Sequence, residues 1–452
     1  MKHVLAVLLF IPIFLFSFQL VSKADDTKQV TTDKSVYYII VDRFYNGDRS
    51  NDIQVNTQDP LAYHGGDIKG IIKRINHIKK MGFTTILLSS IFESRDDDYL
   101  SEDVKDYYKI NPHFGNIDDI KELVRVAHDI HIQIILDLPI SQDGSMDEIA
   151  KAANWWIEEV GVDGFFLKKH LEIPIAEYDK FAHEVKAVNE HVYIILQIDD
   201  GTIDLENSSI DRVVNGDLTV HMRAVLNKPD QSIKPLLNAM EGKAFWKYID
   251  DPNIRRFTYE IVQQNQFPGE RWPLILTFLY TTPGVPAIFY GTEIALNGGE
   301  GAENHRLMDF RADDELIEFM EKLGNIRNHY PSLTDGDLNL LYEEGGMAVY
   351  ANTYKDETTI VALNNSSQNQ TVEISSDLIA PNKQLFGLFE GELIKEKNGT
   401  YVIQMNQEQA EIFVVQNHTG INMMNVTVMT MIPIVFMFFY YFLWKRGKKS
   451  SY

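Results

Sequence analysis

The chain has 452 residues, of which 44% are hydrophobic, and it carries 42 Lys and Arg against 65 Asp and Glu. The net charge of −23 excludes a nucleic-acid binder, because the polyanionic backbone would be repelled. The sequence contains no cysteine, which excludes disulfides, thiolate nucleophiles and cysteine metal sites. The length is sufficient for one large core and a smaller module.

The N-terminal residues 1–24 have the features of an export signal. Lys2 and His3 precede an apolar run at residues 4–20, and SKA at residues 22–24 offers a cleavage site between small residues. We therefore expect a signal peptide at 1–24, and an uncleaved N-terminal anchor is the alternative.

From residue 35 to about 330, short apolar and β-branched segments alternate with segments of helical periodicity. Near-continuous apolar strands between helices are typical of a parallel sheet that is buried on both faces. Eight such strands in succession predict an α/β fold with a TIM (β/α)8 barrel, which we place within residues 25–330. The expected strands are 35–44, 84–90, 132–138, 164–169, 193–198, 212–215, 245–250 and 286–292, and the expected helices include 68–80, 117–131, 147–160 and 176–190.

Beyond residue 330 the pattern changes to an alternation of apolar and polar residues, as in MAVYANTY, TTIVALNN and TYVIQM. Turn sequences separate these segments, with Gly-Gly at 345–346, Asn-Asn at 364–365 and Asn-Gly at 398–399. Such alternation predicts a C-terminal antiparallel β-sandwich domain over residues 331–416.

The C-terminal end has the pattern of a membrane anchor. After a polar linker at residues 417–425, residues 426–444 carry no charge and would extend about 28 Å as a helix. The tail at residues 445–452 is basic, so the positive-inside rule places it in the cytoplasm. We therefore expect a C-terminal transmembrane helix and a single-pass protein of the cell membrane, with its folded part outside.

Several segments resemble the alpha-amylase family of glycoside hydrolases. They are VDRFYNGDRSND (41–52), YHGGDIKGII (63–72), DYYKINPHFG (106–115), GVDGFFLKKH (161–170) and TPGVPAIFYGTE (282–293). The resemblance covers nearly all of residues 35–416 and implies a TIM barrel followed by an antiparallel β domain. It also implies a nucleophilic carboxylate and a carboxylic acid at the C-terminal ends of barrel strands, with a third carboxylate that holds the sugar.

The three carboxylates of the family pattern are replaced in this chain. The fourth-strand motif resembles GxDGFRxDxxxH, and GVDGFFLKKH places Phe166 at the arginine and Lys168 at the nucleophile. Gln197 in YIILQIDDG stands at the general acid. YIDDPNIRRF places Pro252 at a histidine and Asn253 at the third carboxylate.

These replacements predict a catalytically inactive protein. A protonated lysine cannot attack an anomeric carbon, and glutamine cannot protonate a leaving oxygen. Asp137 of the third-strand motif is retained, and we expect it to be the anionic neighbour of Lys168. The family's loop domain after the third strand is nearly absent, since about eight residues (139–146) separate that strand from the next helix.

Displaced carboxylates are the alternative to inactivity. Asp199, Asp200, Asp250 and Asp251 fall near the expected ends of the fifth and seventh strands. They could support weak or altered hydrolysis of α-glucans. They could equally be solvated loop acids or ion-pair partners of Lys168.

One binding site of the family has its residues in place. Six residues between positions 46 and 67 match a calcium site of some family members, and calcium prefers hard oxygen ligands of the kind they carry. The segment NGDRSND alone would be an ordinary polar turn, but the downstream GGD favours a structural calcium ion that ties the first loop to the barrel. The candidate ligands are Asn46, Asp48, Asn51, Asp52, Gly65 and Asp67.

Three classes of function remain open at this point. An inactive member of the family could bind an α-glucan or a protein partner at the cell surface. A weak glycosidase could use the displaced acids. The third class is an accessory subunit of a membrane complex, which rests on fold-level analogy alone.

Overall fold

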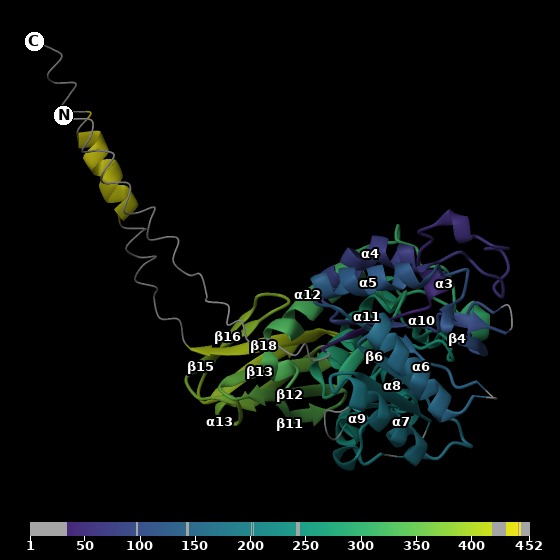
Figure 1. The fold of residues 1–452 in the computed structure, drawn as a ribbon. Helices are drawn as coiled ribbons and strands as arrows, with labels where there is room; N and C mark the ends of the chain where they lie inside the picture. Colours follow the sequence, from purple (N-terminus) through teal and green to yellow (C-terminus); the bar gives the residue numbers. More distant parts are fainter. Residues whose placement is uncertain are drawn as a thin grey trace, which may run out of the picture. The chain divides into compact units, whose positions relative to one another are not determined.

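The computed structural model describes residues 34–95, 98–141, 144–199, 201, 203–240, 245–417, 431–441 and 443, and it contains a closed eight-stranded barrel (Figure 1). Neighbouring strands are parallel and follow one another around the barrel in chain order. This is the predicted TIM barrel. Its strands are β1 (Val36–Ile39), β2 (Thr85–Leu88), β5 (Gln133–Asp137), β6 (Gly164–Lys168), β7 (Tyr193–Ile198), β8 (Arg212–Asn215), β9 (Phe245–Lys247) and β10 (Val285–Phe289).

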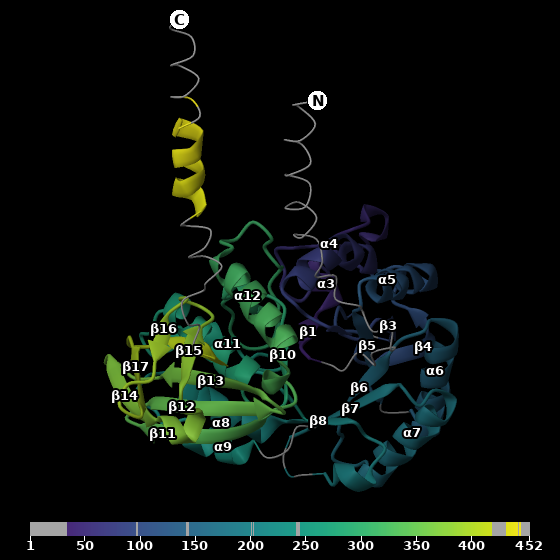
Figure 2. The same cartoon turned by 90° about the vertical axis from the view of Figure 1, so that its left-hand side faces the viewer.

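The strands are apolar because both of their faces are covered. All residues of β1, β2 and β10 are buried. Successive side chains of a strand point to opposite faces, so one set fills the barrel and the other set packs against the surrounding helices. Figure 2 shows these helices outside the barrel strands.

The helices begin at polar caps and turn one apolar face inward. α4 (Ile68–Lys80) buries Ile71, Ile75 and Ile78, which share one face, and the Asp67 carboxylate accepts a hydrogen bond from the Gly70 amide. The other helices of this part are α3 (Val41–Phe44), α5 (Ile117–Asp129), α6 (Met146–Glu159), α7 (Ile175–Val188), α8 (Gly216–Leu226), α9 (Lys234–Ala239), α10 (Phe257–Gln263), α11 (Pro268–Thr281) and α12 (Glu315–His329), with short 3-10 turns at Arg49–Asn51, Leu205–Asn207, Thr292–Ile294, Gly301–Glu303 and Pro331–Leu333.

The connections after the second and third strands differ in length. β5 ends at Asp137 and α6 begins at Met146, so the chain after the third strand is short. The second strand is followed by the antiparallel hairpin of β3 (Phe92–Ser94) and β4 (Val104–Ile110). The loop of this hairpin carries Glu102 to the end of β6, where it forms an ion pair.

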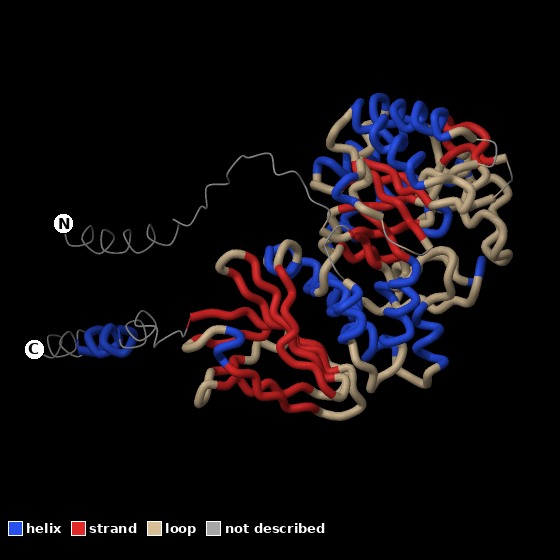
Figure 3. The backbone as a smooth tube through the Cα atoms, turned by 90° about the horizontal axis from the view of Figure 1, so that it is seen from below, coloured by secondary structure: helices blue, strands red, loops and turns tan. Residues whose placement is uncertain are grey.

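The antiparallel β-sandwich follows the barrel, as predicted. One sheet has the order β11-β12-β13-β18-β15-β16, and β14 pairs with β17 in a second sheet. Figure 3 shows the strands of the sandwich in red. Side chains between the sheets, including Ile360, Tyr401 and Phe413, form a core of their own. The elements are β11 (Asp337–Glu344), β12 (Met347–Tyr354), β13 (Glu357–Asn364), β14 (Gln370–Ser375), α13 (Ser376–Ile379), β15 (Lys383–Gly387), β16 (Leu393–Lys395), β17 (Thr400–Met405) and β18 (Ala410–Asn417).

Buried polar contacts attach the sandwich to α11. Arg271 donates to the Leu226 carbonyl at 2.6 Å and to Asn365 Oδ1 at 2.8 Å, and it pairs with Glu408 at 3.1 Å. Three acceptors bind most of the N–H groups of this buried guanidinium. Arg271 therefore holds the sandwich against α11.

The predicted membrane attachment is wrong. No helix among the described residues is long and apolar enough to cross a membrane. Within the expected span at 426–444, residues 431–441 form a helix of about 16 Å, roughly half of the hydrocarbon thickness, and residues 426–430, 442 and 444 lie outside the described part. The expected single-pass localisation, with its cytoplasmic C-terminus, is therefore wrong as well. The same holds for the membrane as a partner. The expected signal peptide at 1–24 lies outside the described residues.

Candidate active site

The side chain of Lys168 lies at the C-terminal mouth of the barrel, where TIM barrels carry their chemistry. Lys168 is the last residue of β6 and pairs in register with Gln197 of β7. Its Nζ lies 3.5 Å from Asp137 Oδ2 and 2.9 Å from Glu102 Oε1. The prediction that Asp137 neighbours Lys168 is confirmed, and Glu102 is a second partner that the motifs did not indicate.

The ammonium of Lys168 is held in its charged form. Burial alone lowers the pKa of Lys168, but the carboxylates of Asp137 and Glu102 outweigh burial and raise the pKa above its ordinary value. The Tyr38 hydroxyl donates to the same Asp137 oxygen at 3.1 Å. A protonated lysine has no lone pair for attack, and its charge opposes a cation-like transition state. Lys168 in this state is therefore no substitute for a nucleophilic carboxylate.

Gln197 and Asn253, which the motif comparison places at the other two catalytic positions of the family, carry neutral amides. Gln197 donates from Nε2 to the Tyr248 hydroxyl at 3.2 Å. Asn253 is exposed, and its backbone amide donates to Asp251 Oδ1 at 2.5 Å. The buried Pro252 accepts from His305 Nε2 through its carbonyl at 2.7 Å. An amide side chain cannot act as a carboxylic acid, so neither position offers a proton donor for a leaving oxygen.

Aromatic rings fill the floor of the barrel mouth. Phe166, at the arginine position of the family motif, stacks on Trp246 with ring centroids 6.4 Å apart and lies 6.3 Å from the Tyr38 ring. The space that these rings leave, together with Phe289 and Asp251, has a volume of about 20 Å³. That volume holds about one water molecule.

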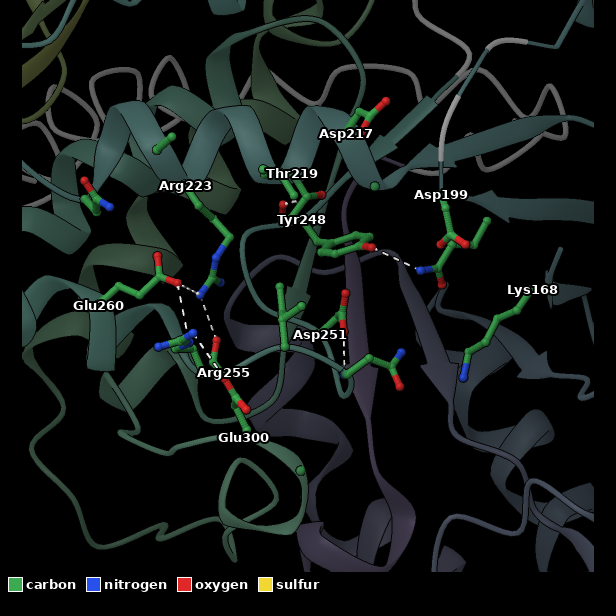
Figure 4. A pocket seen from close by; sticks show the side chains of 18 of the residues that line it. Lys168, Asp199, Asp217, Thr219, Arg223, Tyr248, Asp251, Arg255, Glu260 and Glu300 are labelled. Atoms are coloured by element: carbon green, nitrogen blue, oxygen red, sulfur yellow. Dashed lines mark hydrogen bonds and ion pairs between the residues drawn. The ribbon is translucent and has the colours of Figure 1, made fainter. Parts of the chain in front are cut away.

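A much larger cavity opens beside this floor (Figure 4). Its volume is about 1160 Å³, and we name it the side groove. It extends from the ends of β6 and β7, at Lys168 and Gln197, along α8 and α10 to the loop at Glu300. Figure 4 shows Asp217 and Arg223 on the α8 wall, with Lys168 at the far end of the groove from Glu260. Small-molecule sites of proteins have volumes of about 300–1,000 Å³, so the groove has the size of a ligand site.

The four displaced acids have different surroundings. Asp250 is buried, accepts from the Phe257 amide at 2.6 Å and lies 3.4 Å from Arg223, so its role is structural. Asp251 lines both cavities, and burial raises the pKa of its carboxyl. Asp199 is exposed and lines the side groove. Asp200 lies outside the described residues.

The candidate calcium ligands are brought together in part. Gly65 has φ +87°, and a Cβ there would lie 2.7 Å from Asn46 Nδ2 and 3.0 Å from Asp52 Oδ1. Asn46 and Asp52 also share a hydrogen bond of 2.7 Å. The Oδ1 atoms of Asn46 and Asn51 are buried and accept no hydrogen bond within the described ranges. Orphaned buried oxygens beside a carboxylate fit a hard cation such as calcium.

The remaining two candidate ligands make other bonds. Asp48 accepts from the Ser50 amide at 2.9 Å and pairs with Lys69 at 2.6 Å, and these contacts hold its pKa well below the usual range. Asp67 accepts from three backbone amides, those of Gly47, Asp48 and Gly70, at 2.6–2.9 Å. In the part of the chain that the structure describes, no group of three His, Cys, Asp or Glu could hold a metal. A cation here would therefore depend on amide and carbonyl oxygens.

Motif comparison missed two side chains of the site. Glu102 lies in the segment YLSE (99–102), outside the segments that resemble the family, so no motif pointed to it. His305 Nδ1 accepts a hydrogen bond from the Tyr99 hydroxyl at 2.7 Å, because Nε2 carries the proton that is donated to Pro252. Burial lowers the pKa of His305 to about 4, so the ring is neutral near pH 7. No motif of the sequence pointed to His305.

Comparisons with known proteins agree with this fold. The family model "Alpha amylase, catalytic domain" matches residues 38–205, and "Alpha-amylase C-terminal domain" matches residues 336–413. The crystal structure of an Anoxybacillus alpha-amylase superposes with a TM-score of 0.81 and 34% identity, over 86% of this chain and 99% of that one. The chain belongs to the alpha-amylase family of glycoside hydrolases, which relates it to α-glucan metabolism.

Two curated relatives are more distant. The cyclomaltodextrinase of Thermoanaerobacter pseudethanolicus is 26% identical over 416 residues, which cover 76% of this chain and 72% of the relative. The Beta/alpha-amylase of Paenibacillus polymyxa is 25% identical over 448 residues, which cover 84% of this chain. The chain spans only 38% of the length of the Paenibacillus protein.

Proposed function

We propose that this chain is a member of the alpha-amylase family that binds an α-glucan without hydrolysing it. The observation that carries the proposal is the ion pairing of Lys168 with Glu102 and Asp137 at the nucleophile position. A fixed, protonated cation there opposes both attack on the sugar and the positive charge that develops on it.

Binding is supported by the space and the chemistry beside the barrel mouth. The side groove of about 1160 Å³ presents carboxylates, amides and the Tyr248 hydroxyl, all of which hydrogen-bond to sugar hydroxyls. The relatives are named an alpha-amylase, a Beta/alpha-amylase and a cyclomaltodextrinase. From the names of these relatives we propose an α-glucan as the ligand class of this chain.

Weak hydrolysis through displaced acids is the second candidate, and Asp251 is the observation that favours it. Its carboxyl lines both cavities and has a raised pKa because it is buried, as a general acid requires. A retaining enzyme also needs a second carboxylate about 5 Å away as nucleophile. Lys168 stands at the place of that nucleophile.

The test measures binding and turnover in one sample. Purified protein is titrated with maltooligosaccharides and a cyclodextrin by calorimetry, and release of reducing ends is followed over days. We expect saturable binding and no new reducing ends. Turnover that is lost in Asp251→Asn would overturn the proposal and establish the second candidate. Absence of both binding and turnover would overturn the α-glucan as ligand.

We propose in addition that a structural calcium ion is held beside Gly65. Asn46 Oδ1, Asn51 Oδ1, the Asp52 carboxylate and the Gly65 carbonyl would hold it. The two orphaned amide oxygens support this set over one that includes Asp48 and Asp67. When bound, the ion would tie residues 46–52 to the start of α4.

A further inference from the structure

We infer that Asn398 undergoes spontaneous deamidation, at the turn between β16 and β17 of the sandwich. This inference goes beyond the proposed function, because the turn is no part of the barrel mouth or the side groove. The sequence holds four Asn-Gly pairs, at 46–47, 215–216, 297–298 and 398–399. A glycine leaves the backbone nitrogen after an asparagine unhindered, since it has no Cβ. The four pairs share this chemistry, so the fold decides which of them reacts.

Deamidation begins when the backbone nitrogen of the glycine attacks the side-chain Cγ of the asparagine. A C–N bond closes a succinimide ring, the glycine nitrogen gives its proton to a solvent base, and the side-chain nitrogen leaves as ammonia. Water then adds to one of the two ring carbonyls and yields aspartate or isoaspartate. The reaction therefore requires a side-chain amide and a glycine nitrogen that no hydrogen bond holds apart, with space and water around them.

Asn398 meets these requirements. It lies with Gly399 at the exposed tip of a two-residue hairpin, and both residues have left-handed backbone angles, with φ of +53° and +79°. Within the described residues, the Asn398 side chain and the Gly399 amide take part in no hydrogen bond. A Cβ on Gly399 would have no atom of a more distant residue within 4 Å, so a ring can form there without a clash.

The turn is held at its ends and not at its tip. Lys397 and Thr400 bond to each other across it at 2.8 and 3.1 Å, and the Gly399 carbonyl accepts from the Ser376 amide at 2.9 Å. The peptide bond between Asn398 and Gly399, which has to rotate to bring nitrogen to Cγ, takes part in none of these contacts. Local opening of such a loop tip costs little free energy, so the rotation is accessible.

The pair at Asn46 has the same sequence but is held in place. Asn46 Nδ2 donates to Asp52 Oδ1 at 2.7 Å, and the Gly47 nitrogen donates to Asp67 Oδ2 at 2.9 Å. The atom that would attack is therefore already bound to a carboxylate. Gly47 also lies directly on α4, where a Cβ would be 2.1 Å from the Gly70 nitrogen. The backbone cannot rotate there without disturbing the helix.

Asn215 is protected as the cap of α8. Its Oδ1 accepts from the amides of Asp217 and Leu218 at 2.9 and 3.3 Å. Its Nδ2 donates to the Gly201 carbonyl at 2.9 Å. Both polar atoms of the side-chain amide are bound, so an attack on Cγ would first have to break the cap of a helix.

Asn297 is an intermediate case. Its side chain is exposed, but Gly298 is buried. A Cβ on Gly298 would lie 2.5 Å from the Glu303 carbonyl oxygen, and the Gly298 carbonyl accepts from the Arg256 amide at 3.1 Å. The asparagine is thus free, whereas the glycine that must move toward it is packed.

Both products of deamidation would change the turn at Asn398. Aspartate adds a negative charge beside Lys397. Isoaspartate lengthens the backbone by a methylene, which disturbs the bonds between Lys397 and Thr400 and between Ser376 and Gly399. The modification therefore accumulates with the age of the protein and loosens this end of the sandwich.

The test compares the four pairs within one protein. Wild-type protein is aged at mildly alkaline pH, both folded and in concentrated urea, and is then digested at acidic pH. Mass spectrometry of the peptides measures the conversion of each side-chain amide to an acid. In a second assay, an isoaspartyl methyltransferase with radiolabelled S-adenosylmethionine detects isoaspartate. Asn398→Gly is the control variant, since glycine keeps the left-handed turn and has no side-chain amide.

In the folded protein we expect Asn398 to react at least about tenfold faster than Asn46 and Asn215, with Asn297 between them. In urea the four rates should lie within about threefold of one another, since the fold no longer distinguishes the pairs. Aged wild type should accept methyl groups, and aged Asn398→Gly should lose most of that signal. Three results would each overturn the inference: a folded protein in which Asn398 reacts no faster than Asn46 and Asn215, the same ranking of rates in urea, or a full methyl signal in Asn398→Gly.

Discussion

Lys168 Nζ and Asp137 Oδ2 lie 3.5 Å apart on two neighbouring strands of the barrel, β6 and β5. Asp137 is 3% exposed, and its second oxygen accepts no hydrogen bond within the described residues. The ion pair thus compensates a carboxylate that water does not reach. The lysine that the motif comparison places at the nucleophile position is thus also the partner of a buried carboxylate in the barrel.

Replacement of this lysine by a neutral side chain should destabilise the protein. Lys168→Met leaves Asp137 buried without its cation, and we expect a loss of about 3 kcal/mol in the free energy of unfolding. Lys169→Met, one residue further and without an ion pair among the described residues, should lose less than about 0.5 kcal/mol. Urea unfolding of both variants measures the difference. Equal stability of the two variants would show that Asp137 does not depend on Lys168.

Restoring the three carboxylates should not restore hydrolysis. In Lys168→Asp, Gln197→Glu, Asn253→Asp, the acids return but Phe166 remains where the family motif has an arginine. Side chains two residues apart share one face of a strand, so the restored nucleophile would lack the cation beside it. We expect no reducing ends above the wild-type level in a maltoheptaose assay. Turnover by this triple variant would show that the three carboxylates alone are sufficient for hydrolysis.

The barrel could be predicted because the spacing of apolar residues along the chain reflects which side chains are buried. The helix expected at 68–80 is α4, with the same bounds, because its apolar residues recur on one face and Asp67 caps it. The long-range contacts were not predictable in the same way. Glu102 and Lys168 are 66 residues apart, and no local pattern records a contact of that kind.

Two further features show where sequence patterns are insufficient. Asp250 and Asp251 are identical in type, yet Asp250 accepts from the Phe257 amide and lines only the small cavity, whereas Asp251 also lines the side groove. The uncharged run at 426–444 led to the prediction of a membrane span. Lack of charge does not fix the length of a helix, and the described helix there covers residues 431–441.

Calcium should stabilise the protein through the first loop. We expect chelation by EDTA to lower the melting temperature and added calcium to restore it, because the ion would satisfy the buried oxygens of Asn46 and Asn51. Asp52→Asn should lose most of this calcium response. Asp48→Asn, which breaks only the pair with Lys69, should keep it. Scanning calorimetry with and without calcium measures the response of both variants. An unchanged response in Asp52→Asn would exclude the proposed ligand set.

Stability should depend on pH through Asp42. Burial raises the pKa of this carboxyl from 3.8 to about 6, although the amides of His64 and Gly65 donate to it and Arg43 lies beside it. The folded state therefore holds the proton more tightly than the unfolded state. The stabilisation by this proton is complete below pH 3.8 and is lost as the pH rises through 6, a change of about 3 kcal/mol.

The variant Asp42→Asn isolates this contribution. Relative to wild type, its free energy of unfolding should rise by up to about 3 kcal/mol between pH 4 and pH 7, whatever the constant effect of the substitution. Urea unfolding at several pH values measures the difference. A difference that is independent of pH would contradict a raised pKa at Asp42.

We propose that this member of the alpha-amylase family binds an α-glucan and leaves it intact. The most direct measurement incubates the protein with maltoheptaose in ¹⁸O-water, at a concentration that saturates binding, and follows the products by mass spectrometry. We expect maltoheptaose to keep its full length and to carry no more label than a protein-free sample gains by exchange at the reducing end. Shorter, ¹⁸O-labelled products that disappear in Asp251→Asn would contradict it.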